Sequence, residues 1–186
     1  MNKKFLTLLL LLPLKCYADF NLQQLTDISQ SPEILSGQFI QEKYLAELDI
    51  NLSSSGKFEY KKNKVIQWQT LEPIENLLTM TPQSIISQQG KQTLLDLQAD
   101  SNPLVSLLSE LFFSVLTAQW QDLALYFTFT GSIDDGCWKI ELVPKDATFT
   151  QVINRIELQG DSLLRQLTFY EINGDHTEIT FIKLSQ

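Results

Sequence analysis

Alternating apolar and charged residues mark the stretch 56–82 as a series of short strands. Phe58 and Tyr60 alternate with charged neighbours, which is the period of a strand with one buried face. The charged run 61–64 then interrupts the pattern at Asn63, a natural turn residue. Because parallel neighbours need a crossover of a dozen or more residues, strands this closely spaced predict an antiparallel meander.

Two other segments show helical spacing. Residues 20–30 place apolar side chains three apart and stop before Pro32, which predicts a short amphipathic helix. A second helix is expected from about 103 to 116, because capping residues and a proline stand at its start. Its apolar residues cover most of the circumference rather than one face. It is therefore either a central core helix or a helix between the sheet and a second apolar guest.

The remaining patterns predict about ten strands in all. Residues 34–52 are extended in pattern, residues 53–56 predict a turn, and residues 84–87 and 93–97 predict a hairpin. Later strands are expected, between turn-forming residues, at 123–130, 137–143, 152–158, 163–172 and 177–184. The pattern predicts one mainly β (α+β) domain over residues 19–186.

The N-terminus has the features of a secretory signal. A basic start, an apolar run over 5–14 and small residues before the cleavage point predict a signal peptide over residues 1–18, cleaved after Ala18. The alternative is a lipoprotein signal that acylates Cys16, but large residues precede this cysteine where small ones are usual. We therefore expect an exported, periplasmic protein.

Charge and cysteine content narrow the function further. A net charge of −8 argues against nucleic acid or anionic lipid headgroups as the main partner. Cys137 would be the only cysteine of the exported protein, so no intramolecular disulfide is expected, and its apolar neighbours predict a buried thiol. The single histidine, His176, is expected in a solvated hairpin end.

The sequence carries no recognisable catalytic motif. It has no Gly-x-Ser-x-Gly elbow, no glycine-rich phosphate loop and no His/Cys spacing typical of metal sites. Its acidic pairs fall in expected turns, where aspartate is favoured for backbone reasons. We therefore expect a protein that is not an enzyme, with no cofactor and no metal.

A curved sheet of about ten strands tends to curl into a barrel or half-barrel, which can enclose an apolar cavity. Helices over the open side would keep water out of such a cavity. A closed, fully packed core fits the same residues equally well, so the pattern leaves both architectures open.

Several short motifs bear on this choice. In chain order they are Phe39-x-Gln41-x-Lys43, Gly56-x-Phe58-x-Tyr60, Ile66-x-Trp68, Glu72-Pro73, Trp138-x-Ile140-x-Leu142-x-Pro144 and Asn173-Gly174-Asp175-x-Thr177-x-Ile179-x-Phe181. As a set, behind a signal peptide, they resemble the periplasmic outer-membrane lipoprotein carrier family (LolA), of which this chain would be a divergent member. The resemblance implies an unclosed antiparallel barrel, with helices covering a concave apolar side that holds acyl chains.

The resemblance also implies site residues. Ile66 and Trp68 match cavity positions, and Lys62 matches a position that holds the lid of helices. The other residues that would line the cavity or its roof are Leu22, Leu25, Leu107, Leu108, Leu111 and Phe112. As alternatives, these apolar residues are ordinary core residues, and Lys62 is a solvated turn lysine.

By the same resemblance, the partners are acylated lipoprotein cargo, an inner-membrane ATP-driven exporter and an outer-membrane receptor. We expect a monomer. Two departures from the family favour another lipid or glycolipid cargo as an alternative. The family's Arg-Pro falls on Lys62-Asn63, and the chain stops near Leu184, where members typically continue. A second alternative is a lipid-binding or lipoprotein-sensing module on the same fold that does not shuttle.

Overall fold

A single antiparallel sheet of eleven strands dominates the structure. The computed structural model describes residues 20–186 except 102, 146 and 148, and for 103, 104 and 106–108 it describes the backbone only. The expected signal peptide over residues 1–18 lies outside the described residues. In chain order the strands are β1 (Ile34–Leu45), β2 (Ile50–Lys61), β3 (Val65–Glu72), β4 (Asn76–Met80), β5 (Ser84–Gln89), β6 (Gln92–Gln98), β7 (Phe127–Asp134), β8 (Cys137–Pro144), β9 (Ile153–Gly160), β10 (Leu164–Glu171) and β11 (His176–Ser185).

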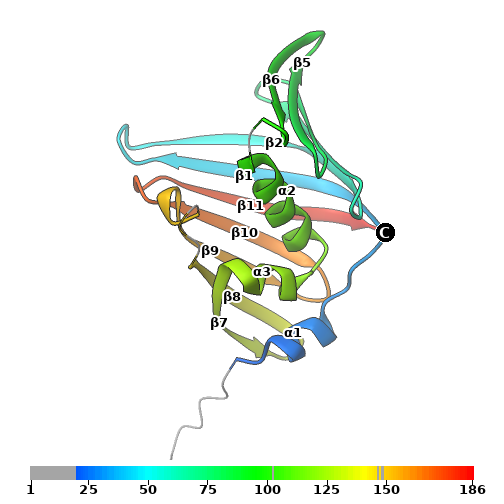
Figure 1. Cartoon of the computed structure of the whole chain (residues 1–186), viewed down its shortest axis with the longest axis vertical. Coiled ribbons are helices and arrows are strands. Elements are labelled where there is room, and N and C mark those ends of the chain that lie inside the picture. Colours follow the sequence, from blue (N-terminus) through cyan, green and yellow to red (C-terminus); the bar gives the residue numbers. More distant parts are fainter. Residues whose placement is uncertain (1–19, 102, 146, 148) are drawn as a thin grey trace, which may run out of the picture.

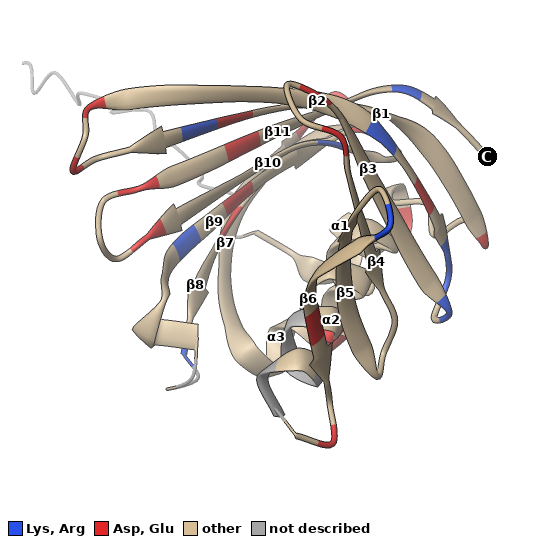
Figure 2. Ribbon diagram, turned by 90° about the horizontal axis from the view of Figure 1, so that it is seen from above, with Lys and Arg blue, Asp and Glu red and all other residues tan. Residues whose placement is uncertain are grey.

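The sheet is curved but does not close. The strands follow the order β6-β5-β4-β3-β2-β1-β11-β10-β9-β8-β7, so β6 and β7 are free edges. Figure 2 shows the sheet as an arch with the helices on its concave side. The predicted mainly β, unclosed half-barrel with helices on the concave side is therefore confirmed, with eleven strands rather than about ten.

Aromatic rings on the concave side organise the sheet. The Phe39 and Trp68 rings, from β1 and β3, stack with their centroids 3.9 Å apart. Gly56 of the intervening β2 lies beneath them, since a Cβ there would come within 2.8 Å of the Phe39 ring. Phe58 and Phe181 extend the cluster on the same face, with ring centroids 5.3 Å apart. The absent side chain of Gly56 thus lets two rings meet across a third strand.

Three helices cover the concave face: α1 (Leu22–Ile28), α2 (Pro103–Leu116) and α3 (Trp120–Tyr126). They lie in front of the sheet in Figure 1. Helix α2 contacts β5 and α3, and α3 in turn contacts β7. Helices α2 and α3 therefore span the open side between the two edges of the sheet. A one-turn 3-10 helix (Phe149–Gln151) connects β8 to β9.

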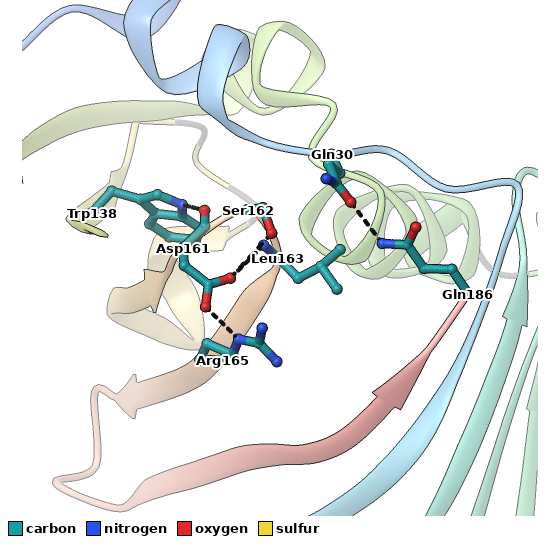
Figure 3. Close-up of polar contacts among 7 residues, drawn as sticks. All are labelled: Gln30, Trp138, Asp161, Ser162, Leu163, Arg165 and Gln186. Atoms are coloured by element: carbon teal, nitrogen blue, oxygen red, sulfur yellow. Dashed lines mark hydrogen bonds and ion pairs between the residues drawn. The ribbon is translucent and has the colours of Figure 1, made fainter. Parts of the chain in front are cut away.

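Polar contacts tie the segment after α1 to the far half of the sheet (Figure 3). The Gln30 backbone N–H donates to the Ser162 carbonyl at 2.7 Å, and the Gln186 side chain donates to that of Gln30 at 2.7 Å. Asp161, beside Ser162, is partly buried, which raises the pKa of its carboxyl. Hydrogen bonds, first from Arg165, outweigh this effect and leave the pKa lower than usual. The ionised Asp161 accepts from the Leu163 backbone N–H and from Arg165, which fixes the β9–β10 turn that Gln30 contacts.

Most predicted strands and turns are confirmed, but two predictions were wrong. The turn in 34–61 lies at 46–49, and residues 53–56 belong to β2. Gly56 marks the close ring approach described above, and Asp49, at φ 52°, supplies the left-handed turn residue instead. Residues 123–126 belong to α3, not to a strand. A segment of seven residues makes only about two helical turns, which is too short to show a helical period.

Two single-residue expectations also fail. Cys137 is exposed, because its neighbours Trp138 and Ile140 point to the concave face while Cys137 points away. His176 is half-buried as the first residue of β11, not a solvated turn residue. Its ring lies between those of Tyr44 and Tyr170, with centroids 5.1 and 5.6 Å away.

The Gly56 contact predicts a sensitive position. In Gly56→Ala the new Cβ would stand 2.0 Å from the Gln69 backbone oxygen, so strand β3 must move. We expect the free energy of unfolding to fall by about 3 kcal/mol, the upper range for overpacking. Gly90→Ala is the control: nothing lies within 4 Å of its Cβ, so only the left-handed backbone costs about 1 kcal/mol. Equal losses in urea unfolding would contradict the role of Gly56.

Candidate functional site

An apolar cavity of about 120 Å³ lies between the concave face and α2. It is lined by Gln41, Ile66, Trp68, Leu78, Met80, Phe112, Leu116 and Ile179. All but Gln41 have apolar side chains. The register between β3 and β4 brings four of these residues together, because Ile66 pairs with Met80 and Trp68 pairs with Leu78. Side chains two apart on a strand share a face, so both pairs point to the same side of the sheet.

The free cavity is too small for a long acyl chain. Ligand cavities usually measure about 300–1,000 Å³, and a cavity of about 150 Å³ accommodates benzene. A second space of about 20 Å³ shares four lining residues with the first: Trp68, Phe112, Leu116 and Ile179. Phe112 also packs against Phe169, with ring centroids 5.8 Å apart. Phe112 lines both spaces, so an enlarged cavity would require movement of this side chain or of α2.

The structure brings part of the predicted site together. Ile66, Trp68 and Phe112 line the larger space, and Leu111 lines the smaller one. The side chains of Leu107 and Leu108 lie outside the described residues. The remaining two predicted residues, Leu22 and Leu25, are on α1 and are absent from the lining of both spaces. Leu25 is fully buried.

Five residues that line the larger space were not predicted as site residues: Gln41, Leu78, Met80, Leu116 and Ile179. For Leu78 and Met80 a signal was present, because antiparallel pairing of the apolar stretches on either side of Pro73 sets them opposite Trp68 and Ile66. Gln41 and Ile179 also face each other, but across β1 and β11, which are far apart in sequence. No local pattern indicates that pairing.

Lys62 lies in the β2–β3 turn, at the end of the sheet opposite the β1–β2 turn. Its backbone N–H donates to the Glu33 carbonyl at 2.9 Å, and its side chain makes no hydrogen bond or ion pair with another described residue. The next residue, Asn63, faces Glu110 of α2 and Asp122 of α3 across a cleft of about 300 Å³. The turn therefore faces the helices, and Lys62 does not hold them in this state.

Tyr60 lies opposite the cavity residue Ile66 in the register of β2 and β3, and it is fully buried. Its hydroxyl donates to the Pro32 carbonyl at 3.2 Å. Burial, followed by the nearby negative charge of Glu33, raises its pKa above the usual value. Tyr60 is therefore neutral at physiological pH and adds no charge to the cavity region.

Helix α2 carries a polar group that is poorly accommodated in the closed state. Ser109 is 0% exposed, and its Oγ has no hydrogen-bond partner among the described residues. The equally buried Thr117 is satisfied, since its hydroxyl donates to the Phe113 carbonyl at 2.7 Å. A buried polar group without a partner costs about 1–3 kcal/mol. Movement of α2 that hydrates Ser109 would recover part of this energy.

Within the described part of the chain, no group of three or more His, Cys, Asp or Glu residues could hold a metal ion. None of the described helices is long and apolar enough to cross a bilayer. The site thus offers burial of apolar groups, and the described lining contains no nucleophile or general base beside the cavity.

Comparison with known families identifies the fold. The family model "Outer membrane lipoprotein carrier protein LolA" matches residues 30–186. The chain belongs to this family. LolA-family proteins bind lipids or lipoproteins and are periplasmic, and the family is not known for enzymes. No curated protein matches the sequence.

Solved structures with similar shape are distant. A LolA superfamily protein from Nitrosomonas europaea has 9% identity and a TM-score of 0.45, over 88% of this chain and 90% of that one. The MucA/MucB complex of Pseudomonas aeruginosa has 15% identity and a TM-score of 0.47, over 88% of this chain and 55% of that one. A DUF1329 family protein from Desulfovibrio piger has 12% identity and a TM-score of 0.43, over 88% of each chain. The family assignment rests on the sequence match.

The unpaired hydroxyl of Ser109 generates a prediction about α2. Ser109→Ala removes the buried polar group, so we expect the free energy of unfolding to rise by about 1 kcal/mol. Because the closed state gains this stability, a fluorescent fatty acid should bind more weakly. Thr117→Val is the control, since it removes a satisfied hydroxyl and should lower stability. A loss of stability in Ser109→Ala, measured by thermal melts, would contradict the account.

Proposed function

We propose that this LolA-family protein is a periplasmic carrier that shields acyl chains in the cavity under α2. The cargo would be lipoproteins or another lipid-anchored molecule, moved from the inner to the outer membrane. The observation that carries the proposal is a cavity with one polar side chain, Gln41, among eight lining residues. Its small volume in the free state suits a carrier that closes when empty.

Closure of the empty cavity would help the carrier to release its acyl chain. Burying an acyl chain stabilises the bound state by about 0.8 kcal/mol per methylene, too much for spontaneous escape into water. Part of this gain is offset if loading must first displace Phe112 from Phe169 and open α2.

We also propose that residues 1–18 direct export and that residues 19–186 form the carrier domain. Lys62 would contact Glu110 or Asp122 across the cleft during this cycle.

The rim near the β1–β2 turn supports an exchange of cargo with membrane-bound partners. Five apolar side chains are exposed on this side of the sheet: Leu48, Ile50, Leu52, Leu71 and Ile74. Leu48, Ile50 and Leu52 lie in or next to the β1–β2 turn, and Leu71 and Ile74 lie next to or in the β3–β4 turn at the same end of the sheet. Exposed apolar side chains mark interaction surfaces where they gather. The partners would be an inner-membrane ATP-driven exporter and an outer-membrane receptor.

Acyl binding is tested at Leu78, a half-buried cavity residue. In Leu78→Glu a carboxylate would lie against the bound chain, so we expect affinity for a fluorescent fatty acid to fall by a factor of about ten or more. Leu78→Phe, which fills the cavity without a charge, should weaken binding as well. The control is Leu125→Glu on α3, at a position 67% exposed and outside the lining.

Fluorescence titration gives the affinities, and circular dichroism melts confirm folding. Equal affinities of the wild type, the Leu78 variants and the Leu125 variant would contradict the proposal that the acyl chain binds in this cavity. Loaded protein should also pass the fatty acid to outer-membrane vesicles. Tight binding without such delivery would favour the alternative, a lipid-binding or lipoprotein-sensing module that does not shuttle.

A further inference from the structure

The concave face changes from apolar to polar along β1. Gln41 lies opposite Ile179 of β11, and both line the cavity. One step further along the same face, Lys43 lies opposite Thr177. Residues two apart on a strand are separated by about 7 Å. Lys43 therefore lies just outside the cavity, on the side of the β1–β2 turn.

An ion pair marks this boundary. Lys43 Nζ lies 3.2 Å from Glu171 Oε1, so the lysine side chain reaches from β1 across β11 to the end of β10. The two side chains are 36% and 28% exposed. Of the concave-facing side chains that β1, β10 and β11 contribute, these two carry the charges. The apolar lining ends where a positive and a negative group stand side by side.

We infer that this Lys43–Glu171 pair is the headgroup subsite of the carrier, and that it takes a zwitterionic phospholipid headgroup. The inference rests on the proposed acyl-binding function and adds phospholipids to the cargo that the cavity would take. With the acyl chain against Trp68 and Phe112, the headgroup lies about one pleat outside the cavity. Its phosphate then pairs with the Lys43 ammonium, and its own ammonium pairs with the Glu171 carboxylate.

Charge explains why a zwitterion is favoured over an anion. An anionic headgroup can pair with Lys43, but its charge then stands beside Glu171 without compensation. Glu47 and Asp49 lie in the β1–β2 turn and Asp175 lies in the β10–β11 turn, and Figure 2 shows acidic residues at the ends of hairpins on this side. They add to the repulsion of an anion. A zwitterion instead replaces one ion pair with two.

The pair can open for a ligand at little cost. Exposed ion pairs contribute only about 0–1 kcal/mol to stability, so separating Lys43 from Glu171 does not threaten the fold. The same weakness limits the preference for a zwitterion to roughly three- to tenfold in affinity at low salt. Screening at high ionic strength should reduce it, because the Debye length falls to about 3 Å at 1 M salt.

The test compares three lipids that share one acyl chain: lysophosphatidylethanolamine, lysophosphatidylglycerol and monoacylglycerol. Dissociation constants are measured by competition with a fluorescent fatty acid, below the micellar concentrations. We expect the wild type to bind lysophosphatidylethanolamine with a three- to tenfold higher affinity than lysophosphatidylglycerol. In Glu171→Gln the ratio should fall to about one, and in Lys43→Met both phospholipids should bind more weakly. Monoacylglycerol should bind all proteins alike.

Glu157→Gln is the control, since Glu157 pairs on the convex face with Arg155 of its own strand, at 3.2 Å, and with Lys139 of β8, at 3.7 Å. Its lipid ratio should equal that of the wild type. A wild-type ratio of one, or a ratio that Glu171→Gln leaves unchanged, overturns the headgroup subsite while monoacylglycerol binding keeps the carrier proposal. Failure of monoacylglycerol to bind any of the proteins overturns both.

Discussion

The structure depends on how a wide apolar sheet face is kept from water without being sealed. Eleven strands leave an open side between β6 and β7, and α2 with α3 covers it. The cover is apolar enough to bury the face, yet Phe112 is only half-buried and Ser109 is buried without a partner among the described residues. A cover with these two defects can move at less cost than a fully packed core helix.

Local patterns predicted much of the sheet. Asn63, at φ 55°, makes the turn expected of it, and the meander of β2, β3 and β4 follows the alternation of apolar residues. The turn at 46–49 was missed because it contains no glycine or proline. Gly56 looked like turn chemistry, but its role is the close approach of the Phe39 and Trp68 rings. That role depends on strand pairing and has no local signature.

The candidate site was only partly accessible to sequence reasoning. Ile66, Trp68 and Phe112 meet at the cavity, and the first two follow from strand period together with the family resemblance. Leu22 and Leu25 do not join them, since α1 packs near α3 and the β9–β10 turn. Pairings between distant strands decide the rest. The Lys43–Glu171 pair joins residues 128 apart in sequence, so no local pattern indicates that this lysine and this carboxylate meet.

Native mass spectrometry of the protein isolated without detergent from the periplasmic fraction tests the central claim most directly. The account predicts a population heavier than the polypeptide by the mass of acyl-bearing lipid. This population should shrink in Leu78→Glu and persist in Leu125→Glu, because Leu78 lines the cavity and Leu125 does not. Spectra that show the bare polypeptide mass alone, in the wild type as in the variants, would contradict the account.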